Sequence, residues 1–233
     1  MCDSSPYVAA LLSPHSSEAT ALVESRDPWI PRRIASFGEL VVWSEVQRAE
    51  AGSRLSGYNV ADGQGVRTVL EHLPGDACEV AINRTHIAGS LGNGAACNLV
   101  QQDGRLWAVE RSAGPKATAS LSPVLYDKPV TFFHTATNGR YLAATMATYP
   151  GEWAFLLARV GEWTFRFIPD EWPAWFTMTS RYLYVMTTFR NKDAGKVTEI
   201  RRYDLDHFDR IGEPYVGVMR PREALDGYSG PDR

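Results

Sequence analysis

Long apolar runs and an excess of basic residues are both missing from this sequence. No stretch approaches the roughly 18 apolar residues that cross a bilayer, because Arg, Glu or Pro interrupts the longest candidates. The formal charge is -3 and the isoelectric point is near 6.0, so no general basic field attracts phosphate backbones or anionic lipid. These two absences argue against a transmembrane segment and against nucleic acid as a partner.

Cysteine is scarce, with three residues in a chain of 233. This number excludes a small domain held together by several disulfides. Cys78 and Cys97 nevertheless flank a predicted hairpin, and a bridge between them would contribute about 3 kcal/mol in an oxidising compartment. Two buried thiols in a reducing cytosol are the alternative, and this is the interpretation that the sequence favours.

A secretion signal is not visible at the N-terminus. Residues 1–6 contain no basic segment followed by an apolar core. The predicted location is therefore cytoplasmic as the sequence is written, and extracytoplasmic if a leader before Cys2 has been removed.

Recognisable catalytic and metal-binding motifs are absent as well. The five histidines lie at positions 15, 72, 86, 134 and 207. None forms a His-x-His or His-Glu-x-x-His pair, which would place two ligands on one metal ion. The chain has no Gly-x-Ser-x-Gly elbow, and no Lys-Ser or Lys-Thr follows its Gly-Asn-Gly segment at 92–94. No cofactor or metal is therefore predicted, and a non-enzymatic role is favoured.

Aromatic residues, glycine and proline are plentiful by contrast. Aromatic residues make up 11% of the chain, and 19 Gly and 14 Pro are spread along it. Aromatic side chains pack well on pleated strands, and glycine and proline suit tight turns. The composition therefore predicts a soluble all-β domain with many short strands.

A degenerate repeat of about 40 to 55 residues organises these strands. In each unit a polar or glycine-marked turn leads into an apolar strand, whose anchors are Leu40, Ile87, Leu142 and Leu183. A second apolar strand follows each anchor, with central residues Tyr58, Trp107, Leu156 and Tyr203. The third unit is the clearest, with four predicted strands at 130–136, 140–148, 153–160 and 164–168. The fourth predicts strands at 175–179, 182–189, 197–205 and 208–211.

This pattern resembles a β-propeller of four or five blades, each blade a four-stranded antiparallel meander, over residues 30–218. It matches no identifiable subfamily, because the WD40, kelch, Tyr-Trp-Thr-Asp and Asp-box signatures are missing. Residues 1–29 are predicted to be an N-terminal extension and residues 219–233 an irregular tail. A strand at 7–12 or at 215–219 would close the ring. Residues 16–24 have the features of a short helix. If the ring is incomplete, a homo-oligomer would complete it.

Two groups of residues are candidates for ligand binding. His86 and His134 lie in strands near the start of their repeats, and the innermost strands of a propeller line its central channel. The tryptophans Trp153, Trp163, Trp172 and Trp175 have carboxylates nearby, as a sugar-binding surface does. Packing between blades is the favoured interpretation of these indoles, and a structural role is the favoured one for the two histidines. The sequence therefore favours a binding or scaffolding propeller with a protein or glycan partner, and a carbohydrate-binding or carbohydrate-active propeller is the alternative.

Overall fold

The structure is a computed structural model that describes residues 8–12, 19–24, 29–47, 52–92, 104–124, 130–148, 153–168, 173–191, 195–210 and 215–219. Most of these residues lie in β-strands. In the described part of the chain, no helix has both the length and the apolar character needed to span a membrane.

Four antiparallel sheets of four strands each follow one another along the chain. Blade 1 contains β3 (Trp29–Phe37), β4 (Leu40–Gln47), β5 (Ser53–Asn59) and β6 (Arg67–Leu73). Blade 2 contains β7 (Asp76–Ile82), β8 (His86–Gly92), β9 (Arg105–Glu110) and β10 (Ser120–Leu121). Blade 3 contains β11 (Val130–Thr137), β12 (Tyr141–Thr148), β13 (Trp153–Arg159) and β14 (Thr164–Ile168). Blade 4 contains β15 (Pro173–Met178), β16 (Tyr182–Asn191), β17 (Gly195–Asp204) and β18 (Tyr215–Met219).

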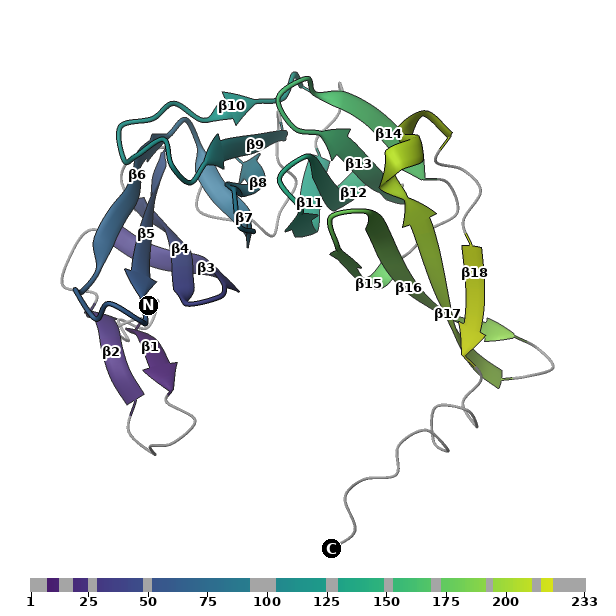
Figure 1. Ribbon diagram of the computed structural model, residues 1–233, viewed down its shortest axis with the longest axis horizontal. Helices are drawn as coiled ribbons and strands as arrows, with labels where there is room; N and C mark the ends of the chain where they lie inside the picture. The colour runs from purple at the N-terminus through teal and green to yellow at the C-terminus, as the bar shows by residue number, and fades with distance from the viewer. Residues whose placement is uncertain are drawn as a thin grey trace, which may run out of the picture.

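The blades stand side by side along an open arc, with the first strand of each blade on the inner side (Figure 1). These first strands contact one another in order: β3 touches β7, β7 touches β11, and β11 touches β15. The described sheets do not close into a ring. The architecture is therefore all-β and of the propeller type, as the repeat predicts.

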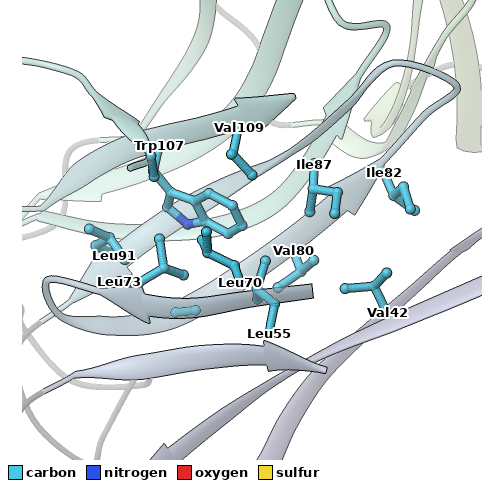
Figure 2. Packing of buried hydrophobic residues seen from close by; sticks show 12 residues of the cluster. Val42, Leu55, Leu70, Leu73, Val80, Ile82, Ile87, Leu91, Trp107 and Val109 are labelled. Atoms are coloured by element: carbon cyan, nitrogen blue, oxygen red, sulfur yellow. The ribbon is translucent and has the colours of Figure 1, made fainter. Parts of the chain in front are cut away.

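Alternation along the strands places successive side chains in different interfaces between blades. Ile87 belongs to the cluster between blades 1 and 2, which Figure 2 shows around Trp107, whereas the next residue, Ala88, packs in the cluster between blades 2 and 3. In blade 3, Leu142 faces blade 2, while Tyr141 joins the cluster shared with blade 4. The anchors Ile87, Leu142 and Leu183 are fully buried. The repeat in the sequence therefore records the apolar contacts that hold one blade against the next.

One predicted strand is wrong. Residues 208–211 were expected to form the outer strand of the fourth unit, but Leu205–Arg210 is a 3-10 helix and β18 is the outer strand. Strand alternation would place Leu205 and Phe208 on opposite faces, whereas a period of three residues places them on one face. Both are buried, and the Phe208 ring stacks on Tyr141 with centroids 5.2 Å apart. Packing of both side chains against the apolar surface of blade 3 therefore favours a 3-10 helix over a strand in this segment.

The N-terminal segments form a separate hairpin. β1 (Val8–Leu12) pairs with β2 (Ala19–Glu24) in a two-stranded sheet, so the strand predicted near 7–12 is present and the short helix considered for 16–24 is not. Neither β1 nor β18 closes a ring among the described residues, since β1 pairs with β2 and β18 pairs with β17. The tail from residue 220 onward lies outside the described residues, and the domain boundaries stay predictions.

Candidate functional site

The innermost strand of every blade carries a register shift of the kind that a β-bulge produces. The shifts lie between Pro31 and Ile34 in β3, Ala77 and Glu79 in β7, Phe133 and Thr135 in β11, and Pro173 and Trp175 in β15. In the neighbouring strands, the residues that face these shifts lie two to five positions after the repeat anchors. A bulge bends its strand and re-aims a side chain. The inner side of the arc therefore carries a row of displaced residues, which we call the bulge row.

Contacts join the bulge row across neighbouring blades. Arg33 Nη2 lies 3.2 Å from Glu79 Oε1, and Arg33 Nε donates a hydrogen bond to the Cys78 carbonyl at 2.8 Å. Burial raises the pKa of Glu79 above its ordinary value, although the charges of Arg33 and His134 oppose that rise. The rings of His134 and Trp175 lie 6.3 Å apart, and His134 has a positive φ of 47°. The row thus brings together two predicted site residues, His134 and Trp175.

The first hairpin turns of the blades, at residues 38–39, 83–85, 138–140 and 179–181, form one end of the molecule, which we call the turn face. Side chains hold three of these turns in place. Asn83 Oδ1 accepts hydrogen bonds from the backbone N–H groups of Thr85 at 2.8 Å and His86 at 2.7 Å. Asn138 Oδ1 likewise accepts hydrogen bonds from the backbone N–H groups of Arg140 at 3.1 Å and Tyr141 at 2.9 Å. Thr179 Oγ1 accepts from the Tyr182 N–H at 2.9 Å. Such short-range bonds fix the backbone of a turn without any partner.

A repeated backbone hydrogen bond ties each turn to the end of the third strand. It runs from an N–H group just after that strand to a carbonyl of the turn, in the pairs Val60 to Glu39, Arg111 to Thr85, Val160 to Arg140 and Leu205 to Arg181. The four distances lie between 2.8 and 2.9 Å. The turn face is therefore built alike in all four blades.

Neighbouring turns also touch one another. Asn138 Nδ2 donates to the Thr179 carbonyl at 2.9 Å, which joins blades 3 and 4. Gly139 has a φ of +90°, and a Cβ placed on it would lie 2.4 Å from Thr85 Oγ1 and 3.1 Å from His86 Nδ1. A side chain at this position would separate blades 2 and 3, so glycine permits their close approach.

Two adjacent depressions lie on the turn face. The larger has a volume of about 1000 Å³ and is bounded by the start of β6, the turn between β7 and β8, the segment after β9 and the turn between β11 and β12. The smaller, of about 630 Å³, is surrounded by the turn ends of the four innermost strands. Arg84 and Asn138 line both. The four-blade repeat thus creates a continuous concave surface at this end.

The larger depression has an unusual balance of charge. Its lining includes Arg67, Arg84, Arg111 and Arg140, together with His86, and the one carboxylate among the lining residues is Glu110. Arg111 is fixed by hydrogen bonds from its Nη1 to the carbonyls of Asn83 at 2.9 Å and Arg84 at 3.2 Å. The depression therefore has positive character in a chain whose formal charge is -3.

The predicted tryptophans do not form one exposed platform among the described residues. Trp163 is 9% exposed, and its Nε1 donates to Ser120 Oγ of blade 2 at 2.9 Å, which is the packing role favoured for these indoles. Trp175 is 61% exposed on β15. The side chain of Trp153 and the whole of Trp172 lie outside the described residues. A ligand-binding role for these indoles stays a prediction.

The other predicted residues lie in separate places on the inner strands and their neighbours. His86 lines the larger depression, whereas His134 lies in the bulge row. Cys78 occupies the bulge of β7 and is disulfide-bonded. Cys97 lies outside the described residues, so the pairing of these two cysteines also stays a prediction.

Sequence reasoning missed the arginines of the larger depression and the pair of Arg33 and Glu79. Arg84 and Arg140 stand in the polar turns that mark the repeat, so their recurrence before the anchors Ile87 and Leu142 was a usable signal. Arg67 had no such signal, because it reaches the depression from the outer strand of another blade.

Comparisons with known proteins find similarity of structure without similarity of sequence. No family model and no curated protein matches the chain. A mutant of the Synechocystis apocarotenoid oxygenase gives a TM-score of 0.51 at 13% identity, with 92% of this chain and 56% of that chain covered. An oligogalacturonate lyase in complex with manganese gives 0.52 at 9% identity, with 89% and 70% covered. TolB from Acinetobacter baumannii gives 0.48 at 10% identity, with 88% and 46% covered.

The chain spans about half the length of the apocarotenoid oxygenase and of TolB. The oxygenase and the lyase are propeller-type folds, and at identities of 13% and 9% the likeness concerns the fold alone. The protein is therefore a propeller-type chain of four described blades, with no subfamily assigned.

Proposed function

We propose that this chain is a non-enzymatic binding or scaffolding module of the β-propeller type, which takes its ligand or partner on the turn face. The observation that carries this proposal is the pair of adjacent depressions that share Arg84 and Asn138. A concave surface with a few polar groups is the usual form of a ligand site. In propellers and other repeat folds, side chains from several units converge at such an end.

Rigidity supports the same proposal. The turns that border the depressions are held by the side chains of Asn83, Asn138 and Thr179 and by the repeated hydrogen bond to the third strand. A surface that is ordered before binding loses less conformational entropy when it binds. The turn face therefore has the property that a specific binding surface needs.

The experiment compares ligand-induced thermal shifts of the wild-type protein with those of two matched variants. A mixed library of glycans, organic acids and short peptides is screened against wild type, Arg84→Ser and Arg105→Ser. Arg105 begins β9, and the far end of this strand, Glu110, lies at the larger depression. Arg105→Ser therefore removes the same charge as Arg84→Ser, but about 16 Å away along the strand. We expect hits whose shifts are lost in Arg84→Ser and retained in Arg105→Ser. Hits that both variants retain would place binding elsewhere, and turnover of a hit would exclude the non-enzymatic role.

A carbohydrate-binding or carbohydrate-active propeller is the second candidate, and one observation favours it. Trp175 is 61% exposed beside His134 in the bulge row, so an indole and an imidazole are available to a ligand there. Indole faces stack on sugar rings. Replacing Trp175 with Ala should then abolish the binding of a glycan hit while Arg84→Ser preserves it. Glycan binding that persists in Trp175→Ala would remove this candidate.

A further inference from the structure

The larger depression collects positive charge that the rest of the chain does not share. Four arginines line it against a single carboxylate, that of Glu110, although acidic residues outnumber Lys and Arg by 27 to 24 in the whole chain. A cleft lined by charges of one sign concentrates their field and raises the local concentration of oppositely charged ligands. The charge of this depression therefore points to an anionic ligand.

The arginines remain able to bind such a ligand. Arg111 uses Nη1 to hold the carbonyls of Asn83 and Arg84, which leaves the N–H groups of Nε and Nη2 without a partner among the described residues. Arg67 and Arg84 are exposed, and neither forms an ion pair within the described parts of the chain. Arg140 lies 4.0 Å from Asp206, and both side chains are more than half exposed, so this contact is worth at most about 1 kcal/mol.

The spacing of these groups favours more than one negative charge on the ligand. The four arginines come from four separate segments around a depression of about 1000 Å³, at the upper end of the range for small-molecule sites. A single carboxylate would meet one or two guanidinium groups and leave the others unpaired. Leu40, Val69 and Pro115 are partly or fully exposed and add apolar surface to the same lining, which suits a carbon skeleton.

We propose that the larger depression binds a small organic polyanion that carries two or more carboxylate or phosphate groups. The anionic groups of the ligand bind Arg84 in the turn between β7 and β8, Arg111, which is hydrogen-bonded to that turn, and Arg67 and Arg140 at the sides. Guanidinium groups bind carboxylate and phosphate through paired, charge-assisted hydrogen bonds. This inference rests on the proposed function, because it names the ligand class for the same face.

Isothermal titration calorimetry of the full chain tests the proposal with two probes. Citrate represents polycarboxylates and fructose 1,6-bisphosphate represents organic phosphates, while sorbitol is the uncharged control and sodium chloride controls for ionic strength. We expect at least one probe to bind at millimolar concentration or below, and sorbitol not to bind. The probe that binds more tightly identifies the anionic group.

Variants then locate the site. Arg67→Ser and Arg84→Ser should each weaken binding by about tenfold or more, because each loses a charge-assisted hydrogen bond, whereas Arg105→Ser should leave it unchanged. Arg67 and Arg84 hold no other described side chain through an ion pair, so neither substitution breaks a described ion pair within the protein. Equal losses in all three variants would indicate attraction to net charge only and would overturn the proposal.

The result also separates this proposal from the one on which it rests. If neither probe binds at millimolar concentration, the polyanion class is wrong. The turn face would still stand as the binding surface if library hits lose their thermal shift in Arg84→Ser. If probes and hits all bind equally well to Arg84→Ser, both proposals fail.

Discussion

Replacing Gly89 with Ala should destabilise the protein through a clash with backbone. Gly89 lies in β8 opposite Val80, beside the bulge of β7. A Cβ on Gly89 would lie 1.9 Å from the Glu79 carbonyl oxygen, 2.8 Å from the Glu79 carbonyl carbon and 3.1 Å from Trp107 Cζ2. The two nearest atoms belong to the main chain, so no change of rotamer can relieve the overlap.

The magnitude follows from what must move. Separating β7 from β8 strains the hydrogen-bonded ladder of blade 2 and the packing of the fully buried Trp107. Inserting an extra carbon into a packed core costs about 1 to 3 kcal/mol, and a backbone clash lies at or above the upper value. The lower entropy of an unfolded chain with Ala in place of Gly offsets about 0.4 to 1 kcal/mol of this. We therefore expect a net loss of about 2 to 3 kcal/mol, or about 4 to 12 °C in Tm for a chain of this size.

The neighbouring position is the control. Ser90 is fully buried, and its Oγ has no hydrogen-bond partner in the described part of the structure. Ser90→Ala removes an unpaired polar atom. The free energy of unfolding of this variant should therefore equal that of wild type or be higher by up to about 1 kcal/mol. Urea unfolding followed by tryptophan fluorescence measures all three proteins. A Gly89→Ala protein within about 0.5 kcal/mol of wild type would refute the placement of the bulge against β8.

Four further predictions concern stability and association. Glu45 is 2% exposed and accepts hydrogen bonds from Trp43 Nε1 at 2.8 Å, Ser56 Oγ at 2.9 Å and Arg54. Glu45→Ala should therefore lower the free energy of unfolding in urea by about 3 to 5 kcal/mol. A loss below about 1 kcal/mol would contradict this hydrogen-bond network. Burial raises the pKa of Asp76, so the stability that its protonated form contributes is present at low pH and is lost as the pH rises through the folded-state pKa. The stability of Asp76→Asn relative to wild type should therefore grow as the pH rises above about 4, and a pH-independent difference would show that burial does not perturb this group. Trp163→Phe loses the hydrogen bond to Ser120 and should lower the free energy of unfolding by about 1 to 2 kcal/mol. Adding Ser120→Ala to Trp163→Phe should lower it little further, because the hydrogen bond is already lost, and a double-mutant cycle measures this coupling. Ile34, Phe37 and Trp175 expose 61%, 44% and 61% of their surface on the inner strands, so the chain should self-associate, and a monomeric mass in light scattering at micromolar concentration would contradict this expectation.

The repeat could be predicted from the sequence because apolar residues recur at the same position of each unit. Ile87, Leu142 and Leu183 recur for a simple reason: each fills the interface between two blades. The turns of the second and third units were equally readable, since Asn83 and Asn138 are residues that stabilise their own turns. Local chemistry and packing agree at these places, so the sequence specifies them without knowledge of the fold.

The bulge row could not be predicted. The residues at the shifts include Arg33, Cys78, His134 and Ala174, which share neither size nor charge. A bulge is defined by its extra residue relative to the partner strand, so it becomes visible only when the two strands are paired.

The arginine-lined depression was hidden for a different reason. Arg67, Arg84, Arg111 and Arg140 are separated by 17 to 29 residues along the chain and belong to three blades or their adjoining loops. Each looks like an ordinary solvated charge when it is considered alone. The arrangement of the blades brings the four arginines together, and no local motif in the sequence indicates that they lie close to one another.

Hydrogen–deuterium exchange with a bound library hit tests the central claim, that ligands bind on the turn face, most directly. Peptides that contain residues 83–86, 111–115 and 138–141 should exchange more slowly with the ligand than without it, while peptides around Arg33 and Trp175 should not change. Protection confined to the bulge row, with unchanged exchange at the three turn-face segments, would contradict the claim.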